Sequence, residues 1–204
     1  MIAFSWGVPA DRGTARNATA TWEAFAQRLT APPPRGSETM VEYAQAPKET
    51  RDRLKLANWY VGGPSVDGKR TKDSYPLRTM LTLDIDDATP AFVAKLHKGN
   101  GMEYVFHTTR SSTPDAPRLR LIFPLAAPIS ADLHARVVLG LASRIERNPG
   151  VIMDRCSIDA ARLLYGPTLC RDAPHVAGRC PGAFPYVEAL AALVPIPVPV
   201  APNR

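Results

Sequence analysis

The stretch LTLDIDD, residues 81–87, places two aspartates two positions apart inside an apolar run. Side chains alternate across a β-strand, so Asp84 and Asp86 should project from one face and the apolar residues beside them from the other. Two neighbouring carboxylates repel each other and lose hydration on burial, so both stay ionised only if a cation lies between them. A divalent metal ion is the simplest candidate. The stretch therefore predicts a buried strand that carries a metal site.

Strands and helices are expected to alternate around this stretch. Apolar runs and alternating patterns predict strands at 1–8, 56–61, 78–86, 102–107, 118–125, 151–153 and 161–165. Apolar residues at helical spacing, with capping residues and stop signals, predict helices at 22–29, 90–98 and 131–147. Residues 31–53 are polar and proline-rich, so they are expected to be mostly loop, with room for a short helix near 48–54.

Length and composition indicate one globular domain. The chain has 204 residues, of which 45% are hydrophobic and 22% charged, which is enough for a core without disulfides. The 25 Lys and Arg against 19 Asp and Glu give a net charge of +6, which suits a polyanionic partner without requiring one. Because no apolar run is long enough to span a bilayer and the amino terminus does not resemble a signal peptide, we expect a cytoplasmic protein without membrane contact.

Three cysteines are too few, and odd in number, for a secreted disulfide framework. Together with His175 they have the spacing Cys-x13-Cys-x4-His-x4-Cys, formed by Cys156, Cys170 and Cys180. Thiolate and imidazole are ligands that zinc prefers, but the Cys-x2-Cys pairs of structural zinc sites are missing. The spacing therefore argues against zinc and for scattered reduced thiols.

The chain ends in LVPIPVPVAPNR, with proline at alternate positions. Proline cannot donate to a sheet ladder, so this segment is expected to run as extended polyproline. We interpret 191–204 as a linker or tail. One hypothesis is that the chain is the amino-terminal part of a longer protein; the alternative is a natural disordered tail.

The paired aspartates lie among segments rich in Arg and Ser, which suggests an α/β or α+β sheet with an acidic centre on one face. Two-metal phosphoryl transfer needs carboxylates that hold two ions roughly 3.5–4 Å apart. Arg and Lys nearby would neutralise a triphosphate. A D-x-D pair alone is a weak signal, because surface strands often carry one.

Three segments strengthen that signal: LTLDIDD, FHTTRSSTPDAPRLRLIFPL (106–125) and IMDRCSIDAARLLYGP (152–167). In order and spacing they resemble the three motifs of the archaeo-eukaryotic primase superfamily. The resemblance is greatest to its phage and plasmid primase-polymerase domains, which are often joined to a replicative helicase. It covers roughly residues 55–190.

The resemblance implies a two-part α+β fold in which an antiparallel catalytic sheet, similar to an RNA-recognition module, is flanked by helices. A catalytic domain would then span 1–190, with an N-terminal subregion at 1–55 and a catalytic core at 56–190. It also implies catalytic acids that hold two Mg²⁺ or Mn²⁺ ions. Asp84 and Asp86 match the first motif, and Asp154 fits the third motif, with Asp159 as the alternative ligand.

The second family motif usually reads Ser-x-His, with the His on the phosphates of the incoming nucleotide. This chain has Thr108-Thr109-Arg110 there, so Arg110 would replace the imidazole. Arg can bind phosphate bidentately and does not titrate, although it cannot act as a neutral acceptor. Ser111 and Ser112 would add hydroxyl donors. The replacement of the imidazole by Arg110 affects the prediction of catalysis more than the prediction of nucleotide binding.

Further basic residues have two readings each. Arg118 and Arg120 share a strand face, which could point into the acidic centre or toward solvent. Arg162 fits a phosphate ligand or a structural ion pair. His107, at a strand end, is a candidate nucleotide ligand, although such a histidine is more often a satisfied core residue. The basic loop 62–73 is either solvated or grips nucleic acid, through Lys69, Arg70 and Lys72.

The resemblance therefore predicts a DNA primase or primase-polymerase: a metal-dependent, template-directed nucleotidyltransferase that adds an NTP or dNTP to a 3′-hydroxyl and releases pyrophosphate. Its partners would be single-stranded DNA template, NTP or dNTP, and a helicase domain further along a longer parent protein. Two alternatives remain. One is a nucleic-acid-binding replication-initiation module with weakened catalysis, and the other is a metal-dependent nuclease.

Overall fold

The computed structural model describes residues 1–194, so most of the proline-rich segment expected at 191–204 lies outside the described residues. The strands are β1 Ile2–Gly7, β2 Arg16–Ala20, β3 Trp59–Val61, β4 Leu77–Asp87, β5 Tyr104–Thr108, β6 Leu119–Ser130, β7 Ile152–Met153, β8 Leu164–Tyr165 and β9 Ala177–Cys180. The helices are α1 Trp22–Thr30, α2 Met40–Gln45, α3 Lys48–Leu54, α4 Pro90–Lys98, α5 Ala131–Ile145 and α6 Val187–Ala191, with short 3₁₀ helices η1 Lys72–Ser74 and η2 Arg155–Ile158.

The strands form two sheets in which every neighbouring pair is antiparallel. The four-stranded sheet has the order β2-β1-β3-β8, and the five-stranded sheet has the order β7-β4-β6-β5-β9. The smaller sheet takes β3 and β8 from beyond residue 55, so the subregion boundary expected at 55 does not separate the two sheets. The α+β class and the antiparallel five-stranded sheet agree with the expected fold.

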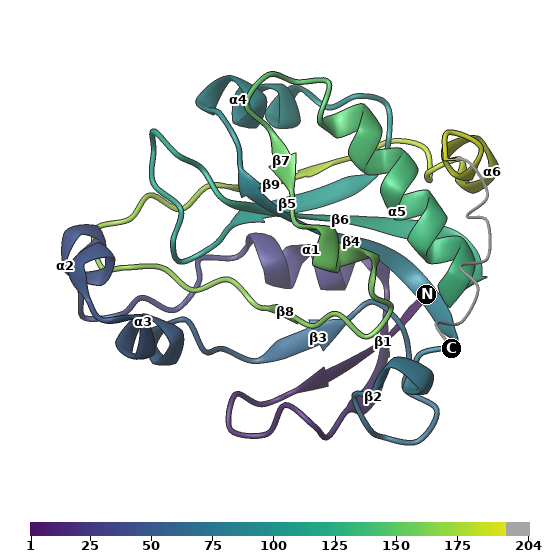
Figure 1. Cartoon of the computed structure of the whole chain (residues 1–204), viewed down its shortest axis with the longest axis horizontal. Helices are drawn as coiled ribbons and strands as arrows, with labels where there is room; N and C mark the ends of the chain where they lie inside the picture. The colour runs from purple at the N-terminus through teal and green to yellow at the C-terminus, as the bar shows by residue number, and fades with distance from the viewer. Residues whose placement is uncertain (195–204) are drawn as a thin grey trace, which may run out of the picture.

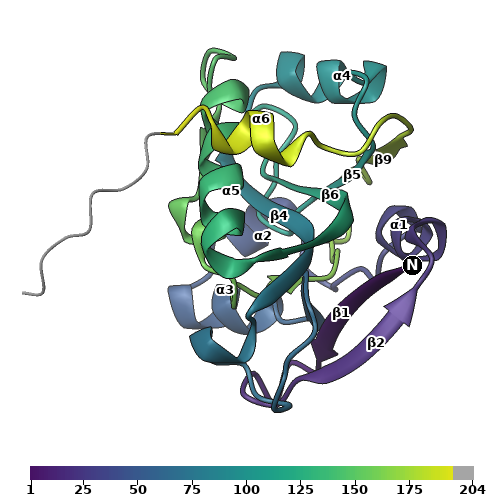
Figure 2. The same ribbon diagram turned by 90° about the vertical axis from the view of Figure 1, so that its right-hand side faces the viewer.

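Helices cover one face of the five-stranded sheet, and the smaller sheet lies toward the other (Figure 1). Leu81, Leu83 and Ile85 of β4 are fully buried in the larger hydrophobic core, which they share with α4, α5 and α6. Figure 2 shows α1 beside the β1–β2 hairpin, away from these helices. No helix in residues 1–194 combines the length and the apolar character needed to cross a membrane.

The opposite face of the five-stranded sheet changes character along β4. Met80 packs with Val105 and Ile122 in a second apolar core that includes α1 and the smaller sheet. Further along the same face, the register places Asp84 directly opposite Arg120. The layer between the sheets is therefore apolar at one end and charged at the other, because residues two apart on a strand share a face.

Hydroxyl side chains begin most of the longer helices, as the sequence predicts. Thr21, Thr89 and Ser130 accept hydrogen bonds from main-chain N–H groups in the first turns of α1, α4 and α5. Thr39 begins α2 with a reciprocal contact to Glu42.

The structure confirms the strands and helices predicted in the core but adds two strands, two α-helices and the two 3₁₀ helices. The prediction that 31–53 is mostly loop is wrong at α2, because the capping box at Thr39 and the single buried Tyr43 stabilise a helix too short to show a periodic pattern. The predicted short helix near 48–54 is confirmed as α3. Strands β2 and β9 and helix α6 were not predicted. Strand β2, with the sequence RNATA, pairs with β1, and its only apolar residues are two alanines, which give a weak alternation signal.

Candidate active site

Asp84 and Asp86 lie at the carboxyl end of β4 and project from the same face, as predicted. The side chain of Asp84 is 13% exposed, and that of Asp86 is 48% exposed. The Asp84 main-chain N–H donates to the buried hydroxyl of Ser157 at 2.9 Å. A side chain of the third segment, 152–167, therefore binds the main chain of the first segment, 81–87.

Asp154 follows β7, which pairs with β4, and its main-chain N–H donates to the carbonyl oxygen of Asp84 at 2.8 Å. Its carboxylate caps η2 by accepting from the Cys156 N–H at 2.8 Å. Since short polar side chains favour this capping geometry, Asp154 is held in place by its own neighbours. Acids about seventy positions apart thus meet at one end of the sheet.

Three arginines bind these acids. Arg118 Nη2 lies 3.5 Å from Asp86 Oδ1, and Arg120 Nε lies 3.7 Å from Asp84 Oδ1. Of the two predicted orientations, both arginines therefore have the one toward the acidic centre and not the one toward solvent. Arg120 Nη1 also donates to the carbonyl oxygen of Tyr165 at 2.5 Å, which ties β6 to β8.

Arg162 lies between two of the acids. Its Nη2 is 2.7 Å from Asp154 Oδ2 and 3.8 Å from Asp84 Oδ2. Repulsion between neighbouring carboxylates calls for a cation between them, and in this structure a guanidinium stands in that position. Of the two readings for Arg162, the ion pair is observed, and the residue also faces the cavity described next.

The acids and arginines line an open cavity of about 800 Å³. Its charged lining comprises eight basic residues and five acidic ones, so the cavity keeps a net positive charge despite its acids. Such a charge favours an anionic ligand. The basic residues are Arg12, Arg53, Lys55, Arg70, Arg110, Arg118, Arg120 and Arg162, and the acidic ones are Asp52, Asp84, Asp86, Asp154 and Asp159.

The carboxyl group of Asp86 has a pKa above its ordinary value. Burial is the main cause, and the negative charges of Asp84 and Asp154 add to it, whereas Arg118 lowers the pKa. Carboxylates that interact in this way release electrostatic strain when a cation joins them. Burial and the neighbouring carboxylates thus both disfavour the charged form of Asp86.

This donor set fits a hard divalent cation in its chemistry, because Mg²⁺ and Mn²⁺ prefer carboxylate oxygen. In its present conformation, however, no group of three or more His, Cys, Asp or Glu within residues 1–194 is spaced to hold a metal ion. Arg162 lies where the carboxylates of Asp84 and Asp154 would share an ion. Cys156, Cys170 and Cys180 are free thiols, the last two of them buried.

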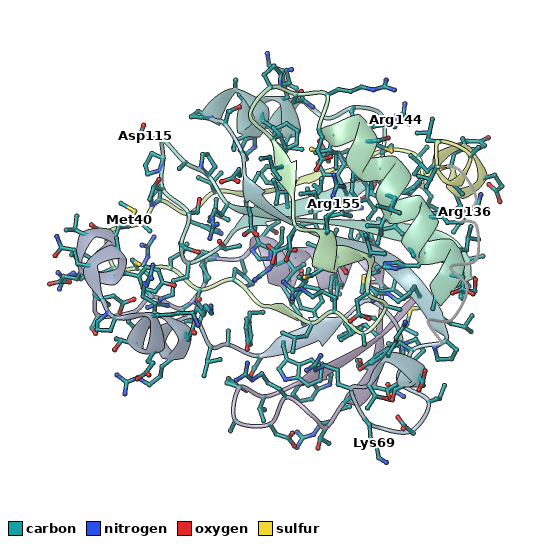
Figure 3. The ribbon with its side chains drawn as sticks, viewed as in Figure 1. Met40, Lys69, Asp115, Arg136, Arg144 and Arg155 are labelled. Carbon is teal, nitrogen blue, oxygen red and sulfur yellow. The ribbon has the colours of Figure 1, made fainter. Side chains whose placement is uncertain are left out.

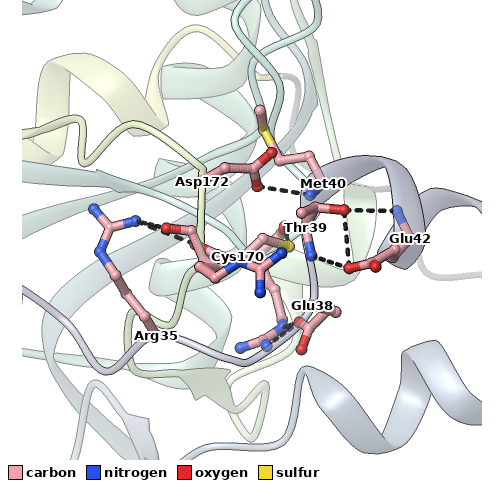
Figure 4. Close-up of polar contacts among 9 residues, drawn as sticks. Arg35, Glu38, Thr39, Met40, Glu42, Cys170 and Asp172 are labelled. Carbon is pink, nitrogen blue, oxygen red and sulfur yellow. Dashed lines mark hydrogen bonds and ion pairs between the residues drawn. The ribbon is translucent and has the colours of Figure 1, made fainter.

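Arg110 lines the cavity and is bound by an acid that is not part of the cavity lining. Its Nε donates to Glu38 Oε1 at 2.9 Å, and its Nη2 also contacts that oxygen. The Tyr43 ring lies 6.0 Å from the guanidinium carbon. Glu38 belongs to a dense polar cluster around the start of α2, shown in Figure 4, in which Arg35 binds main-chain carbonyls near Cys170 and the Met40 N–H donates to Asp172.

Four predicted site residues do not line this cavity. His107 is completely buried on β5, and its pKa falls to about 3, mainly through burial and then through the charge of Arg120. Ser112 is buried, and its hydroxyl accepts from the Arg118 N–H at 3.1 Å. Lys69 and Lys72 are exposed, and Figure 3 shows Lys69 at the edge of the molecule, far from Arg155. The remaining predicted residues, Ser111 and Arg70 among them, line the cavity.

Sequence reasoning missed Arg12, Arg53 and Lys55 in the cavity wall and Glu38 behind it. Arg12 lies in the connection between β1 and β2, and Arg53 and Lys55 lie at the end of α3. An isolated basic residue in a polar segment carries no signal of its own. Only the contacts between distant segments, such as the hydrogen bond from the Gly166 N–H to the Asn58 carbonyl, bring them to the site.

Comparisons with known proteins bear on the fold and the family of the chain. The structure is similar to the AEP domain of the primase-polymerase of cyanophage S-2L, with a TM-score of 0.50 and 11% sequence identity. The similarity covers 95% of this chain and 89% of the phage domain, and at this identity it shows the fold alone. No curated protein gives a significant match.

A family model for the VapE N-terminal domain matches residues 2–184. The match includes all three acids and every arginine that lines the cavity. The structural similarity adds that the fold is that of the phage AEP domain. The chain belongs to the VapE N-terminal domain family.

Proposed function

We propose that this domain is a template-directed nucleotidyltransferase, a DNA primase or primase-polymerase that extends a 3′-hydroxyl with an NTP or dNTP. The observation that carries the proposal is the convergence of Asp84, Asp86 and Asp154 with four arginines on one open cavity. Family membership supports the class of protein, and the phage primase-polymerase supports the fold.

The acids would hold Mg²⁺ or Mn²⁺, which supplies charge neutralisation and activates the attacking oxygen. Asp84 and Asp86 come from one strand face, and Asp154 follows the neighbouring strand β7, so the three carboxylates approach from two directions. Asp159 also lines the cavity and is the reserve ligand. For Asp84 and Asp154 to share an ion, Arg162 has to turn toward the triphosphate.

The arginines would bind the nucleotide. Arg110, Arg118 and Arg120 are held by Glu38 and by the main-chain carbonyls of Asp86 and Tyr165, which reduces the entropy lost when a phosphate binds. Arg162 would join them after leaving Asp154. The 3′-hydroxyl oxygen would attack the α-phosphorus as its proton leaves, and the bond to the β-phosphate would break to release pyrophosphate. In such reactions the protein acts mainly by positioning and by charge stabilisation.

A second function has a specific observation in its favour. Each of the three acids already has an arginine partner, which is the arrangement of a basic binding module that works without metal. Such a module would bind nucleic acid in replication initiation without making a product.

The deciding experiment is primer extension with a labelled primer on a single-stranded DNA template, with NTPs or dNTPs and Mn²⁺. We expect extension by the wild type and its loss in Asp84→Asn and Asp86→Asn. Asp115→Asn serves as the matched control, because Asp115 is exposed on the loop after β5, away from Arg155 (Figure 3). Titration of Mn²⁺ by calorimetry should show binding that both active-site variants weaken.

The other outcomes separate the alternatives. Template binding without product in the wild type supports the binding module and overturns the polymerase. Shortening of the template strand supports a metal-dependent nuclease, in which water takes the place of the sugar hydroxyl.

The proposed partners are single-stranded DNA template, the nucleotide and a helicase domain of a longer parent protein. The family's description as an N-terminal domain supports a parent that carries further segments.

A further inference from the structure

Three cations on the cavity wall have no acidic partner among residues 1–194. The other five basic residues of the lining are paired: Arg110 with Glu38, Lys55 with Asp52, and Arg118, Arg120 and Arg162 with the catalytic acids. Arg12, Arg53 and Arg70 form no ion pair within the described residues. These three residues, here called the unpaired arginines, outnumber the one acid of the lining, Asp159, that forms no ion pair within residues 1–194.

Arg70 is held in place by main-chain carbonyls. Its Nε donates to the carbonyl oxygen of Arg12 at 2.7 Å, and its Nη1 donates to that of Ala161 at 3.3 Å. The two loops are also joined by main-chain bonds, from Arg70 N–H to Gly13 and from Ala15 N–H to Gly68, at 2.8 and 2.7 Å. Since these bonds leave the charge of Arg70 uncompensated, the loop pair presents a fixed cation.

Two of the unpaired arginines, Arg70 and Arg12, are connected by hydrogen bonds to the segment that carries Arg162. Ala161, which accepts from Arg70, immediately precedes Arg162, which binds Asp84 and Asp154. The main-chain carbonyl of Arg12 accepts in turn from Arg70 Nε. Hydrogen bonds to main-chain carbonyls thus connect the segments of Arg162, Arg70 and Arg12, and all three residues line the cavity.

Arg53 reaches the same cavity from another segment. It lies exposed in the last turn of α3. The chain that follows α3 is fixed to the end of β8, where the Gly166 N–H donates to the Asn58 carbonyl at 2.8 Å. Tyr165, half-buried at this end of β8, also lines the cavity.

We propose that the unpaired arginines bind the phosphodiester backbone of a single-stranded polynucleotide, the template or primer strand. The inference rests on the proposed function and adds a strand-binding wall to its nucleotide site. A free triphosphate would be bound near the acids by the paired arginines, whereas a polynucleotide presents a row of phosphates that reaches further along the wall. Tyr165 supplies an aromatic face for a base, as non-specific single-strand binders use.

The test is fluorescence anisotropy with a labelled single-stranded DNA, in EDTA and without nucleotide, at several salt concentrations. The double variant Arg12→Ala/Arg53→Ala is the main probe, because both side chains are exposed and donate none of the described hydrogen bonds. The logarithm of the affinity against the logarithm of the salt concentration should lose about 0.7 in slope for each phosphate contact removed, or about 1.4 for the double variant. Arg12→Glu/Arg53→Glu should weaken binding further.

Arg144→Ala is the matched control, because Arg144 is an exposed arginine on α5 without an ion pair in the described residues and lies well away from β8 (Figure 3). It should leave the slope unchanged. An unchanged slope in the double variant, with the fold intact by circular dichroism, overturns the proposal. So does complete displacement of the DNA by a small excess of free nucleotide, since that outcome assigns the wall to the triphosphate. Because this assay contains no metal, its result is independent of whether the domain extends a primer.

Discussion

The main-chain N–H of Asp154 donates to the carbonyl oxygen of Asp84 at 2.8 Å, so backbone pairing joins the first and third motifs. The return contact is a side chain: the hydroxyl of Ser157 accepts from the Asp84 N–H at 2.9 Å. The separation of the two acids is thus set by a short strand pair together with η2. Their carboxylates then need no acid-to-acid contact to stay at a fixed spacing.

The Ser157→Ala variant tests this connection. Ser157 is fully buried, so its loss leaves the Asp84 N–H without an acceptor, which should cost about 1–3 kcal/mol of unfolding free energy. Urea denaturation measures the loss, and Mn²⁺ binding should weaken in parallel. Ser37→Ala is the control, because Ser37 is exposed, and it should change stability by less than about 0.5 kcal/mol. Wild-type stability in Ser157→Ala would show that the hydrogen bond is not needed to hold the motifs together.

The sequence predicts the part of the site that depends on strand periodicity. Alternation along LTLDIDD places Asp84 and Asp86 on one face, and the same period places Arg118 and Arg120 toward them. Position along a strand is local information, so the pattern is enough. The caps at Thr89 and Ser130 are equally local.

The rest of the site depends on contacts between distant segments. Glu38 pairs with Arg110 across 72 positions, and no spacing or motif connects the two. Nothing in a polar loop distinguishes Arg12 from any other surface arginine, and only the pairing of the loop with residues 68–70 brings it to the cavity. His107 is the converse case, because its position beside a motif suggested a ligand, whereas tertiary packing buries it.

The Glu38–Arg110 pair should couple strongly in a double-mutant cycle. Their side chains are only 12% and 6% exposed, so removing one partner leaves a buried charge uncompensated. Glu38→Gln and Arg110→Met should each cost about 3–5 kcal/mol of stability, and the double variant should cost clearly less than their sum. Urea denaturation of all four proteins gives the coupling energy.

The exposed pair Lys48–Asp52 is the matched control for that cycle, since its side chains are 84% and 43% exposed. It should show a coupling of at most about 0.5 kcal/mol. Additive effects of Glu38→Gln and Arg110→Met would contradict the structural role assigned to the pair.

Gly140 on α5 should resist a substitution that favours helices. Alanine is preferred over glycine by about 1 kcal/mol in a helix interior, but a Cβ at position 140 would overlap the main chain of Leu190 in α6. Gly140→Ala should therefore destabilise the protein, by about 1–3 kcal/mol, because one of the two helices has to move. Thermal unfolding measures the effect, and Ser143→Ala, an exposed position on the same helix, should not lower stability. A higher Tm for Gly140→Ala would contradict the close packing of α5 and α6.

Stability should fall in mild acid because His107 is buried in its neutral form. Its pKa is lowered to about 3, so the folded protein takes up the proton far less readily than the unfolded chain, whose histidine has a pKa near 6.5. The stabilising effect is complete above pH 6.5 and is lost as the pH falls from there toward 3, by up to about 1.4 kcal/mol per pH unit. His134, also buried with a lowered pKa, acts in the same direction.

The His107→Gln variant isolates the contribution of His107. Urea denaturation at pH 7.5 and pH 5 should show a loss of stability between the two that is about 2 kcal/mol smaller in the variant than in the wild type. Val105→Ala on the same face of β5 is the control, because it removes buried apolar contacts and should lower stability equally at both pH values. If His107→Gln loses as much stability as the wild type between pH 7.5 and 5, the acid sensitivity arises from other groups. His107 would then be protonated in the folded protein at pH 5.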